Sequence, residues 1–161
     1  MAIQVGERLP QATFRIMTPD GPTAKTTDDL FKGRKVALVG VPGAFTPTCH
    51  RNHLPGYVQK ADELKAKGID AIAITSVNDV FVMDAWAKAS EGDGIEFLAD
   101  GNGDFAKAIG LTMDGSGFGL GLRSRRYAMI VDDGVVKSLN VEEASGKAEI
   151  SGVDNLLTCL T

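Results

Sequence analysis

Short apolar runs recur along the chain, separated by stretches in which apolar residues return every three or four positions. The runs at 35–41 and 70–77 are rich in β-branched residues and predict two buried strands. A third short strand is expected at 96–98. The runs at 127–131 and 135–139 flank an Asp-Asp-Gly turn, which predicts a β-hairpin.

The longest amphipathic stretch predicts a helix from Pro47 to about Lys67. Thr46 is expected as its N-cap, with Pro47 at the first helical position. Pro55 has no backbone N–H to donate, so a kink is expected there, and Gly68 ends the helix. Five apolar residues give this helix one buried face: Leu54, Tyr57, Val58, Ala61 and Leu64.

Shorter helices are expected further along the chain. Asn78 is predicted to cap the first of them, and its apolar residues are Val82, Ala85 and Trp86. The second covers 104–109. A capping-box-like pair, Ser151 and Asp154, begins the last one. Its apolar stripe is Val153, Leu156, Leu157 and Leu160. Strands that alternate with helices, followed by a hairpin and a final helix, predict an α/β layer fold around a mixed sheet.

The composition is that of one soluble domain covering residues 1–161. A formal net charge of −4 provides no basic field, so nucleic acid is not expected as a partner. No apolar run approaches the length of a membrane span, and the first residues lack the charged and apolar regions of a signal peptide. We therefore expect a cytoplasmic protein that does not bind membranes.

The chain has two cysteines, Cys49 and Cys159, which are too few for a disulfide framework and fit a reducing compartment. The absence of a Cys-x-x-Cys motif argues against a structural zinc site. Cys159 lies beside the apolar stripe of the last predicted helix. We expect it to pack as a small apolar residue, with a redox partner as the alternative.

Cys49 falls in the first turn of the predicted helix 47–67. Unpaired backbone N–H groups and the positive end of the helix dipole favour an anionic sulfur at this place. Because the thiolate is the reactive form of cysteine, Cys49 is the leading candidate for a reactive residue. Its neighbours are polar or turn-forming, which favours this interpretation over a buried structural cysteine.

Two other side chains are candidates for acting on Cys49. Thr46 stands where a Cys-x-x-Cys motif would have its first cysteine, and its hydroxyl either bonds a thiolate or bound oxygen or only caps the helix. Arg125 and Arg126 enter the predicted strand 127–131 on opposite faces. They are either solvated cations, or one of them lies near Cys49, stabilises the thiolate and orients a polar substrate.

His50 and His53 are the only histidines and form a Cys-His-x-x-His run with Cys49. This run offers at most three metal ligands, and adjacent residues on a helix diverge. We expect both histidines to be solvated, with a metal-binding module as the alternative. A cysteine hydrolase is not expected, because it needs a histidine base from elsewhere in the chain.

The run Pro42-x-x-x-Thr46-x-x-Cys49 resembles the active-site signature of the peroxiredoxins. The longer segments 40–49 and 53–56 resemble the peroxiredoxin-five, or type II, branch. Further segments extend the likeness over nearly the whole chain: 76–79, 81–86 and 125–129. The resemblance implies a thioredoxin-like fold, with a central mixed β-sheet flanked by helices. It also implies thiol-dependent reduction of hydrogen peroxide and alkyl hydroperoxides without a metal, haem or other cofactor.

The same resemblance implies a role for each site residue. Cys49 matches the peroxidatic cysteine, which attacks the peroxide and becomes sulfenic acid. Thr46 matches the residue that hydrogen-bonds the peroxide, and Pro42 matches the residue that shields the pocket. Arg126 matches the arginine that holds the thiolate and polarises the O–O bond. The family also suggests a homodimer.

Relatives that close an internal disulfide carry a second cysteine near 72–76 or in 147–151, and neither segment has one here. We therefore expect a one-cysteine cycle, in which an external thiol regenerates Cys49. That thiol is expected to be glutathione with glutaredoxin, or else thioredoxin. The alternative is a peroxide sensor or redox-switched binding protein, which would use the same cysteine but would not turn over.

Overall fold

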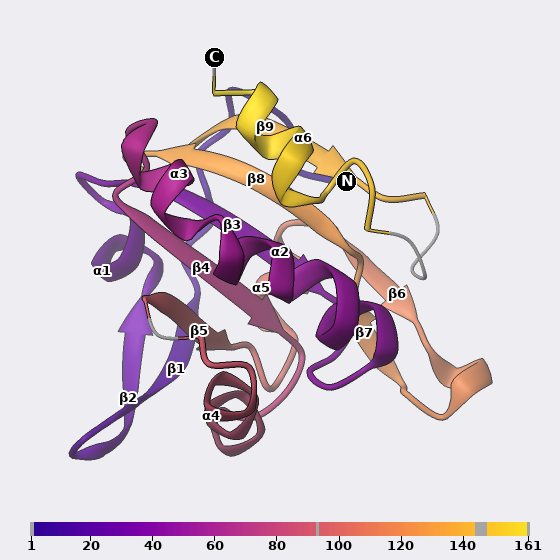
Figure 1. Cartoon of the computed structure of the whole chain (residues 1–161). Helices are drawn as coiled ribbons and strands as arrows, with labels where there is room; N and C mark the ends of the chain where they lie inside the picture. The colour runs from indigo at the N-terminus through magenta and orange to yellow at the C-terminus, as the bar shows by residue number, and fades with distance from the viewer. Residues whose placement is uncertain (1, 93, 144–147, 161) are drawn as a thin grey trace.

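A seven-stranded mixed sheet forms the centre of the protein in a computed structural model that describes residues 2–92, 94–143 and 148–160 (Figure 1). Its strand order is β2-β1-β5-β4-β3-β8-β9. Strands β3, β4 and β5 run parallel, and β8 is antiparallel to β3. The bounds are β3 Lys35–Val41, β4 Ala71–Ser76, β5 Ile95–Ala99, β8 Tyr127–Asp132 and β9 Val135–Val141. All five predicted strands are therefore confirmed, and β8 and β9 form the predicted hairpin.

Two further pairs of strands were not predicted from the sequence. At one edge of the sheet, β1 (Thr13–Thr18) pairs with β2 (Gly21–Thr26). The residues of β2 alternate between exposed and half-buried positions but include few large apolar side chains, so their pattern gives no clear strand signal. A separate two-stranded sheet consists of β6 (Thr112–Asp114) and β7 (Leu122–Ser124).

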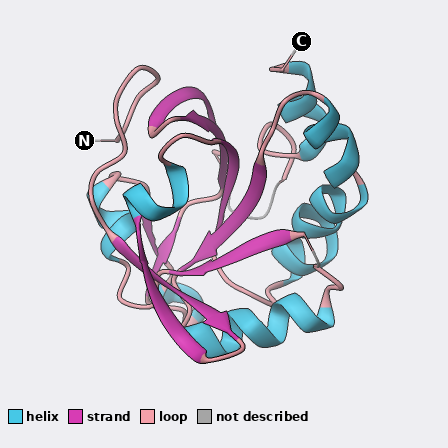
Figure 2. Ribbon diagram, turned by 90° about the vertical axis from the view of Figure 1, so that its left-hand side faces the viewer, coloured by secondary structure: helices cyan, strands magenta, loops and turns pink. Residues whose placement is uncertain are grey.

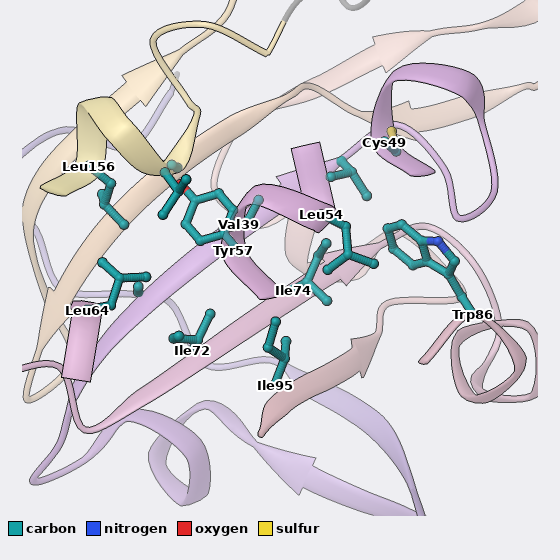
Figure 3. Packing of buried hydrophobic residues seen from close by; sticks show 14 of the residues in the cluster. Val39, Cys49, Leu54, Tyr57, Leu64, Ile72, Ile74, Trp86, Ile95 and Leu156 are labelled. Carbon is teal, nitrogen blue, oxygen red and sulfur yellow. The ribbon is translucent and has the colours of Figure 1, made fainter. Parts of the chain in front are cut away.

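Helices cover both faces of the sheet (Figure 1 and Figure 2). They are α1 Thr27–Phe31, α2 Leu54–Gln59, α3 Ala61–Ala66, α4 Val80–Ala89, α5 Asp104–Ala108 and α6 Val153–Thr158. Side chains of α2, α3, α4 and α6 share one buried cluster, which includes Leu54 and Trp86 (Figure 3). Those of α1 and α5 belong to a second cluster on the other face. Across the described residues, no helix combines the length and the apolar character of a membrane span.

The predicted helix 47–67 is present but irregular. After two helical residues the backbone widens into a π-helical turn, η1 (Cys49–His53), closed by a hydrogen bond from Leu54 N–H to the carbonyl five residues back. Pro55 follows directly and has no N–H to continue a regular helical ladder. The irregularity therefore lies before Pro55, not at a kink centred on it. A second break at Lys60 separates α2 from α3.

The side-chain caps predicted for α4 and α6 are both wrong. Asp79, not Asn78, caps α4, because the Asp79 carboxylate accepts a hydrogen bond from the helix backbone. The helix α6 begins after Gly152 without a side-chain cap, since the Ser151 hydroxyl donates to Glu142 instead. In both places a contact with a distant segment engages the side chain that the local pattern assigned to the helix.

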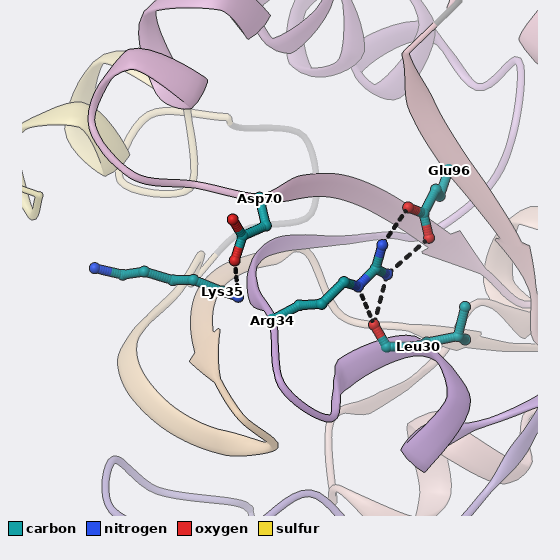
Figure 4. Close-up of polar contacts among 5 residues, drawn as sticks. All are labelled: Leu30, Arg34, Lys35, Asp70 and Glu96. Atoms are coloured by element: carbon teal, nitrogen blue, oxygen red, sulfur yellow. Dashed lines mark hydrogen bonds and ion pairs between the residues drawn. The ribbon is translucent and has the colours of Figure 1, made fainter.

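Polar contacts fix the starting ends of the parallel strands (Figure 4). Arg34 donates to both carboxylate oxygens of Glu96, at 3.0 and 3.1 Å, and also to the Leu30 carbonyl. The Asp70 carboxylate accepts from Lys35 N at 2.8 Å. These bonds connect the residues that begin β3, β4 and β5, so they hold the register of the parallel strands at that end.

Close packing at the other end of β3 requires glycine at position 40. Gly40 pairs with Tyr127 across β3 and β8, and a Cβ on Gly40 would lie 2.0 Å from the Tyr127 ring. The buried ring therefore fixes the first residue of β8 against the end of β3. Arg126, which directly precedes Tyr127, is thereby placed where β3 ends.

Candidate active site

The loop between β3 and η1 is held by hydrogen bonds. Asn78 Oδ1 accepts from Ala44 N at 2.9 Å and from the Ser76 hydroxyl, which ties the loop to the end of β4. Within the loop, Thr46 Oγ1 donates to Gly43 O at 2.7 Å. The loop is therefore fixed both to the neighbouring strand and to itself.

An aromatic cluster lies beside this loop. Phe45 has a positive φ of 63°, an uncommon conformation for a bulky residue. Its ring centroid lies 5.5 Å from that of His50 and 6.4 Å from that of Trp86. Trp86 Nε1 donates to His50 Nδ1 at 3.0 Å. His50 is therefore packed and hydrogen-bonded, which contradicts the prediction of a solvated histidine.

Cys49 is the first residue of η1 and is fully buried. Arg126 Nη2 donates to Cys49 Sγ at 2.9 Å, and only 2% of Arg126 is exposed. The buried sulfur therefore accepts a hydrogen bond from a guanidinium that is itself almost entirely shielded from water. The interpretation of Arg126 as a solvated cation is therefore wrong.

His53 is also buried, contrary to the prediction. Its Nδ1 accepts from Arg126 Nη1 at 2.9 Å, and its Nε2 lies 2.9 Å from Ser151 O. Since arginine only donates, His53 must be neutral, with its proton on Nε2 and directed at the Ser151 carbonyl. Burial lowers the pKa of His53 to about 4; the hydrogen bond to Ser151 opposes this shift and the charge of Arg126 adds to it.

Two more buried residues, Tyr57 and Glu142, extend this network. Tyr57 OH donates to the same Ser151 carbonyl at 2.7 Å, and burial raises the pKa of Tyr57, which keeps the hydroxyl protonated. Glu142 Oε2 accepts from Ser151 N at 2.7 Å and from Ser151 Oγ at 2.6 Å. Glu142 N in turn donates to Arg126 O at 2.9 Å.

Thr46 and Pro42 lie in the loop that precedes Cys49. The Thr46 carbonyl accepts the first helical bond, from His50 N at 2.8 Å, while its hydroxyl donates to Gly43 and does not cap the helix. Because the one hydroxyl hydrogen of Thr46 is used in this way, its oxygen can only accept a hydrogen bond from a substrate. Pro42 is buried, and its carbonyl accepts from Arg123 Nη1 at 3.3 Å.

The geometry gives the metal-binding alternative no support. Among the described residues, no group of three or more His, Cys, Asp or Glu side chains comes together as a metal site. His50 and His53 are each engaged by a different protein donor, Trp86 and Arg126.

Comparison with known proteins decides the family. The Redoxin family model matches residues 4–157. Peroxiredoxin-2E-2 of Oryza sativa subsp. japonica is 51% identical over 165 residues, which cover 98% of this chain and 72% of the relative. This chain is a peroxiredoxin.

Two further similarities cover nearly the whole length of this peroxiredoxin. Peroxiredoxin-2B of Arabidopsis thaliana is 44% identical, over 98% of both chains. The structure of reduced Prx3 from Vibrio vulnificus in complex with hydrogen peroxide is 53% identical, with a TM-score of 0.94 over 99% of both chains. The predicted thioredoxin-like fold is thereby confirmed, and the type-2 names of the relatives agree with the predicted branch.

The site residues predicted for this peroxiredoxin form two groups. Cys49 and Arg126 are in direct contact, although 77 positions separate them in the sequence. Thr46 and Pro42 lie in the adjoining loop, and their own contacts are with Gly43 and Arg123.

Sequence reasoning missed the residues behind Arg126, which are His53, Tyr57, Glu142 and Ser151. Tyr57 was assigned to the apolar face of the helix, and His53 lies four residues before it, so it falls on the same face. That spacing is the one signal that could have indicated a buried histidine. Nothing in the local pattern marks Glu142, because its partner Ser151 comes from a separate segment.

The second cysteine shares none of these features. Cys159 follows α6 and is exposed, so its predicted role as a packed apolar residue is wrong. Asn140 Nδ2 lies 3.8 Å from its sulfur. Figure 1 shows the end of α6 next to the C-terminus, apart from the segment that leads into α2.

Proposed function

We propose that this peroxiredoxin reduces hydrogen peroxide and alkyl hydroperoxides with Cys49 as the attacking sulfur. The observation that carries the proposal is the 2.9 Å contact between Arg126 Nη2 and the buried Cys49 Sγ. One cation there both stabilises the thiolate and provides a donor for an oxygen that gains negative charge. The similar Prx3 of Vibrio vulnificus was solved in complex with hydrogen peroxide, which supports this substrate.

The first step is an in-line attack of the Cys49 thiolate on the nearer peroxide oxygen. The S–O bond forms as the O–O bond breaks, so the sulfur loses two electrons and becomes sulfenic acid. The other oxygen leaves with those electrons and takes a proton to become alcohol or water. Arg126 stabilises the negative charge that develops on the leaving oxygen. The Thr46 hydroxyl oxygen accepts a hydrogen bond from the peroxide O–H and so aligns the peroxide, while Pro42 shields the pocket.

Regeneration uses an external thiol, because neither 72–76 nor 147–151 contains a cysteine. The thiol attacks the sulfenic sulfur, forms a mixed disulfide and releases water. A second thiol attacks that disulfide, returns Cys49 as a thiol and leaves as the oxidised pair. We propose glutathione with glutaredoxin as this pair, with thioredoxin as the competing reductant. The cytoplasmic location stays a prediction.

The external thiol can reach Cys49 only if the buried turn opens. The π-turn η1 is irregular, and Pro55 after it cannot add a backbone hydrogen bond, so this segment is the least costly part of the helix to unwind. Trp86, the one tryptophan of the chain, donates to His50 within η1. Opening would break this bond, so Trp86 fluorescence reports the step.

We also propose a homodimer formed through the face around the β3–η1 loop. Large exposed apolar side chains lie on segments next to that loop: Phe118 (85% exposed), Phe81 (66%), Phe45 (45%) and Leu122 (41%). Apolar side chains that gather on the surface mark an interaction site, and these four are the candidates for one. A dimer that dissociates in the Phe118→Ser variant, measured by light scattering, supports this interface, and an unchanged dimer contradicts it.

The test of the proposed function is steady-state peroxide reduction by wild type, Cys49→Ser and Cys159→Ser. Each is assayed with glutathione and glutaredoxin and, separately, with thioredoxin. We expect loss of turnover in Cys49→Ser alone, and faster turnover with glutaredoxin. A single stoichiometric oxidation without turnover would instead identify a sensor. A Cys49–Cys159 disulfide within one chain, seen by mass spectrometry after one equivalent of peroxide, would overturn the one-cysteine cycle.

A further inference from the structure

Glu142 is a buried acidic residue that the proposed chemistry does not use. Only 5% of it is exposed, and it lies just beyond the end of β9. A buried carboxylate is costly unless hydrogen bonds satisfy it. Glu142 Oε2 accepts two short bonds, both from Ser151, whose own exposure is 0%.

These bonds complete a closed ring of hydrogen bonds behind the reactive sulfur. The Arg126 side chain donates to His53, and the Arg126 backbone carbonyl accepts a hydrogen bond from the backbone N–H of Glu142. His53 lies against the Ser151 carbonyl, and Ser151 donates to the Glu142 carboxylate. The ring therefore joins four separate segments: the start of β8, the turn η1, the start of α6 and the end of β9.

Within this ring the orientation of the guanidinium depends on residues that do not touch Cys49. Arg126 Nη1 has the His53 ring as its partner, and Nη2 has the sulfur. The His53 ring keeps its angle because the Ser151 carbonyl fixes the other nitrogen. The position of that carbonyl in turn depends on Glu142, which binds both the N–H and the hydroxyl of the same residue.

We propose that Glu142 is a positioning residue for the peroxide reaction. Its bonds to Ser151 fix the Ser151 carbonyl, which orients the His53 ring, and the His53 ring in turn orients the Arg126 guanidinium toward Cys49. The inference rests on the proposed role of Cys49. Its effect is geometric, since a small displacement of a charge-stabilising group from the reacting atoms lowers a rate by a large factor. The negative charge of Glu142 is needed less than its acceptor oxygen.

The central experiment compares Glu142→Ala with Glu142→Gln. Single-turnover oxidation by hydrogen peroxide is followed by mass spectrometry of the Cys49 sulfenic acid in samples quenched at successive times. We expect Glu142→Ala to slow this reaction about tenfold or more. Glu142→Gln keeps an acceptor oxygen for both Ser151 donors, so it should restore the rate to within about threefold of wild type. The matched control is Glu143→Gln, which changes the charge of the exposed neighbour and should leave the rate unchanged.

A second measurement separates positioning from loss of folding. Partial unfolding would expose Cys49 and speed its alkylation by iodoacetamide. A displaced Arg126 guanidinium would instead leave Cys49 buried and slow the peroxide reaction more than the alkylation. Ser151→Ala removes one of the two bonds and should give a smaller loss of the same kind, even if Glu142→Ala folds poorly.

Three outcomes would overturn the inference. They are a wild-type rate in Glu142→Ala, equal losses in the Ala and Gln variants of Glu142, and losses in both Glu142→Ala and Ser151→Ala that are accompanied by faster alkylation and a lower melting temperature. Failure of the proposed function would look different, because Cys49→Ser would then still reduce peroxide.

Discussion

Cys49 and Cys159 carry the same thiol in opposite surroundings. Cys49 is fully buried at the start of a helical segment with a guanidinium nitrogen at 2.9 Å, while Cys159 is exposed and has an amide nitrogen at 3.8 Å. Exposure alone would rank Cys159 as the more reactive. The proposed function instead makes Cys49 the reactive cysteine, because the attraction of a charge partner is weakly screened in a site shielded from water.

The largest loss of Cys49 reactivity is expected when its charged partner, Arg126, is removed. We expect Arg126→Gln to slow peroxide reduction about 1,000-fold, which corresponds to about 4 kcal/mol of transition-state stabilisation. Arg126→Lys keeps a cation but loses the two-pronged contact with Cys49 and His53, so its loss should be smaller.

The matched control for this change is Arg51→Gln. Arg51 lies on η1, two residues from Cys49, but is exposed, so the variant changes the net charge equally without touching the sulfur. Its rate should stay within about twofold of wild type, because exposed charges are screened. Equal losses in both glutamine variants would show that overall charge, and not the buried contact, makes Cys49 reactive.

A smaller effect, on stability, follows from the histidine that holds Arg126. The pKa of His53 is about 4 in the folded protein against 6.5 ordinarily. Below pH 6.5 His53 binds a proton in the unfolded chain but stays neutral in the folded protein. The free energy of unfolding therefore falls as the pH drops from about 6.5 to 4. The expected loss over that window is about 3 kcal/mol.

Urea denaturation at pH 7 and pH 4.5 measures this loss. His53→Gln should lose less stability over the window, because its amide can accept from Arg126 and donate to Ser151 without titrating. His50→Gln is the control and should behave like wild type. If wild type and His53→Gln lose stability equally, His53 is not buried in its neutral form.

The sequence predicts those parts of the site that depend on neighbours in the chain. The β-branched run 35–41 becomes β3 with the predicted bounds, and it leads directly into the loop and turn that hold Thr46 and Cys49. Strand formation and the first turn of a helix are local events, so a local pattern can predict them. The place of Arg126 beside Cys49 was implied by family resemblance alone.

The errors at Asn78, Ser151 and His53 occur where a contact with a distant segment replaces the local role that the sequence pattern predicts. Asn78 and Ser151 carry good capping groups, yet both bond to other segments, and neighbouring residues begin the helices. His53 was expected in water because its neighbours are polar, but tertiary contacts bury it. A sequence pattern within one stretch of chain cannot predict which side chains will bond to a distant segment instead of to a local partner.

The π-turn η1 accommodates one more residue than an α-helical turn, and this residue sets the direction in which Cys49 points relative to the side chains of α2. An α-helix turns by about 100° per residue, so removing one residue between Cys49 and Pro55 would rotate everything before the deletion by that angle relative to α2. Leu54 and Tyr57 would still face the sheet, but the sulfur would turn away from the guanidinium. The spacing of this short segment is therefore as much a requirement for the chemistry as the identity of its residues.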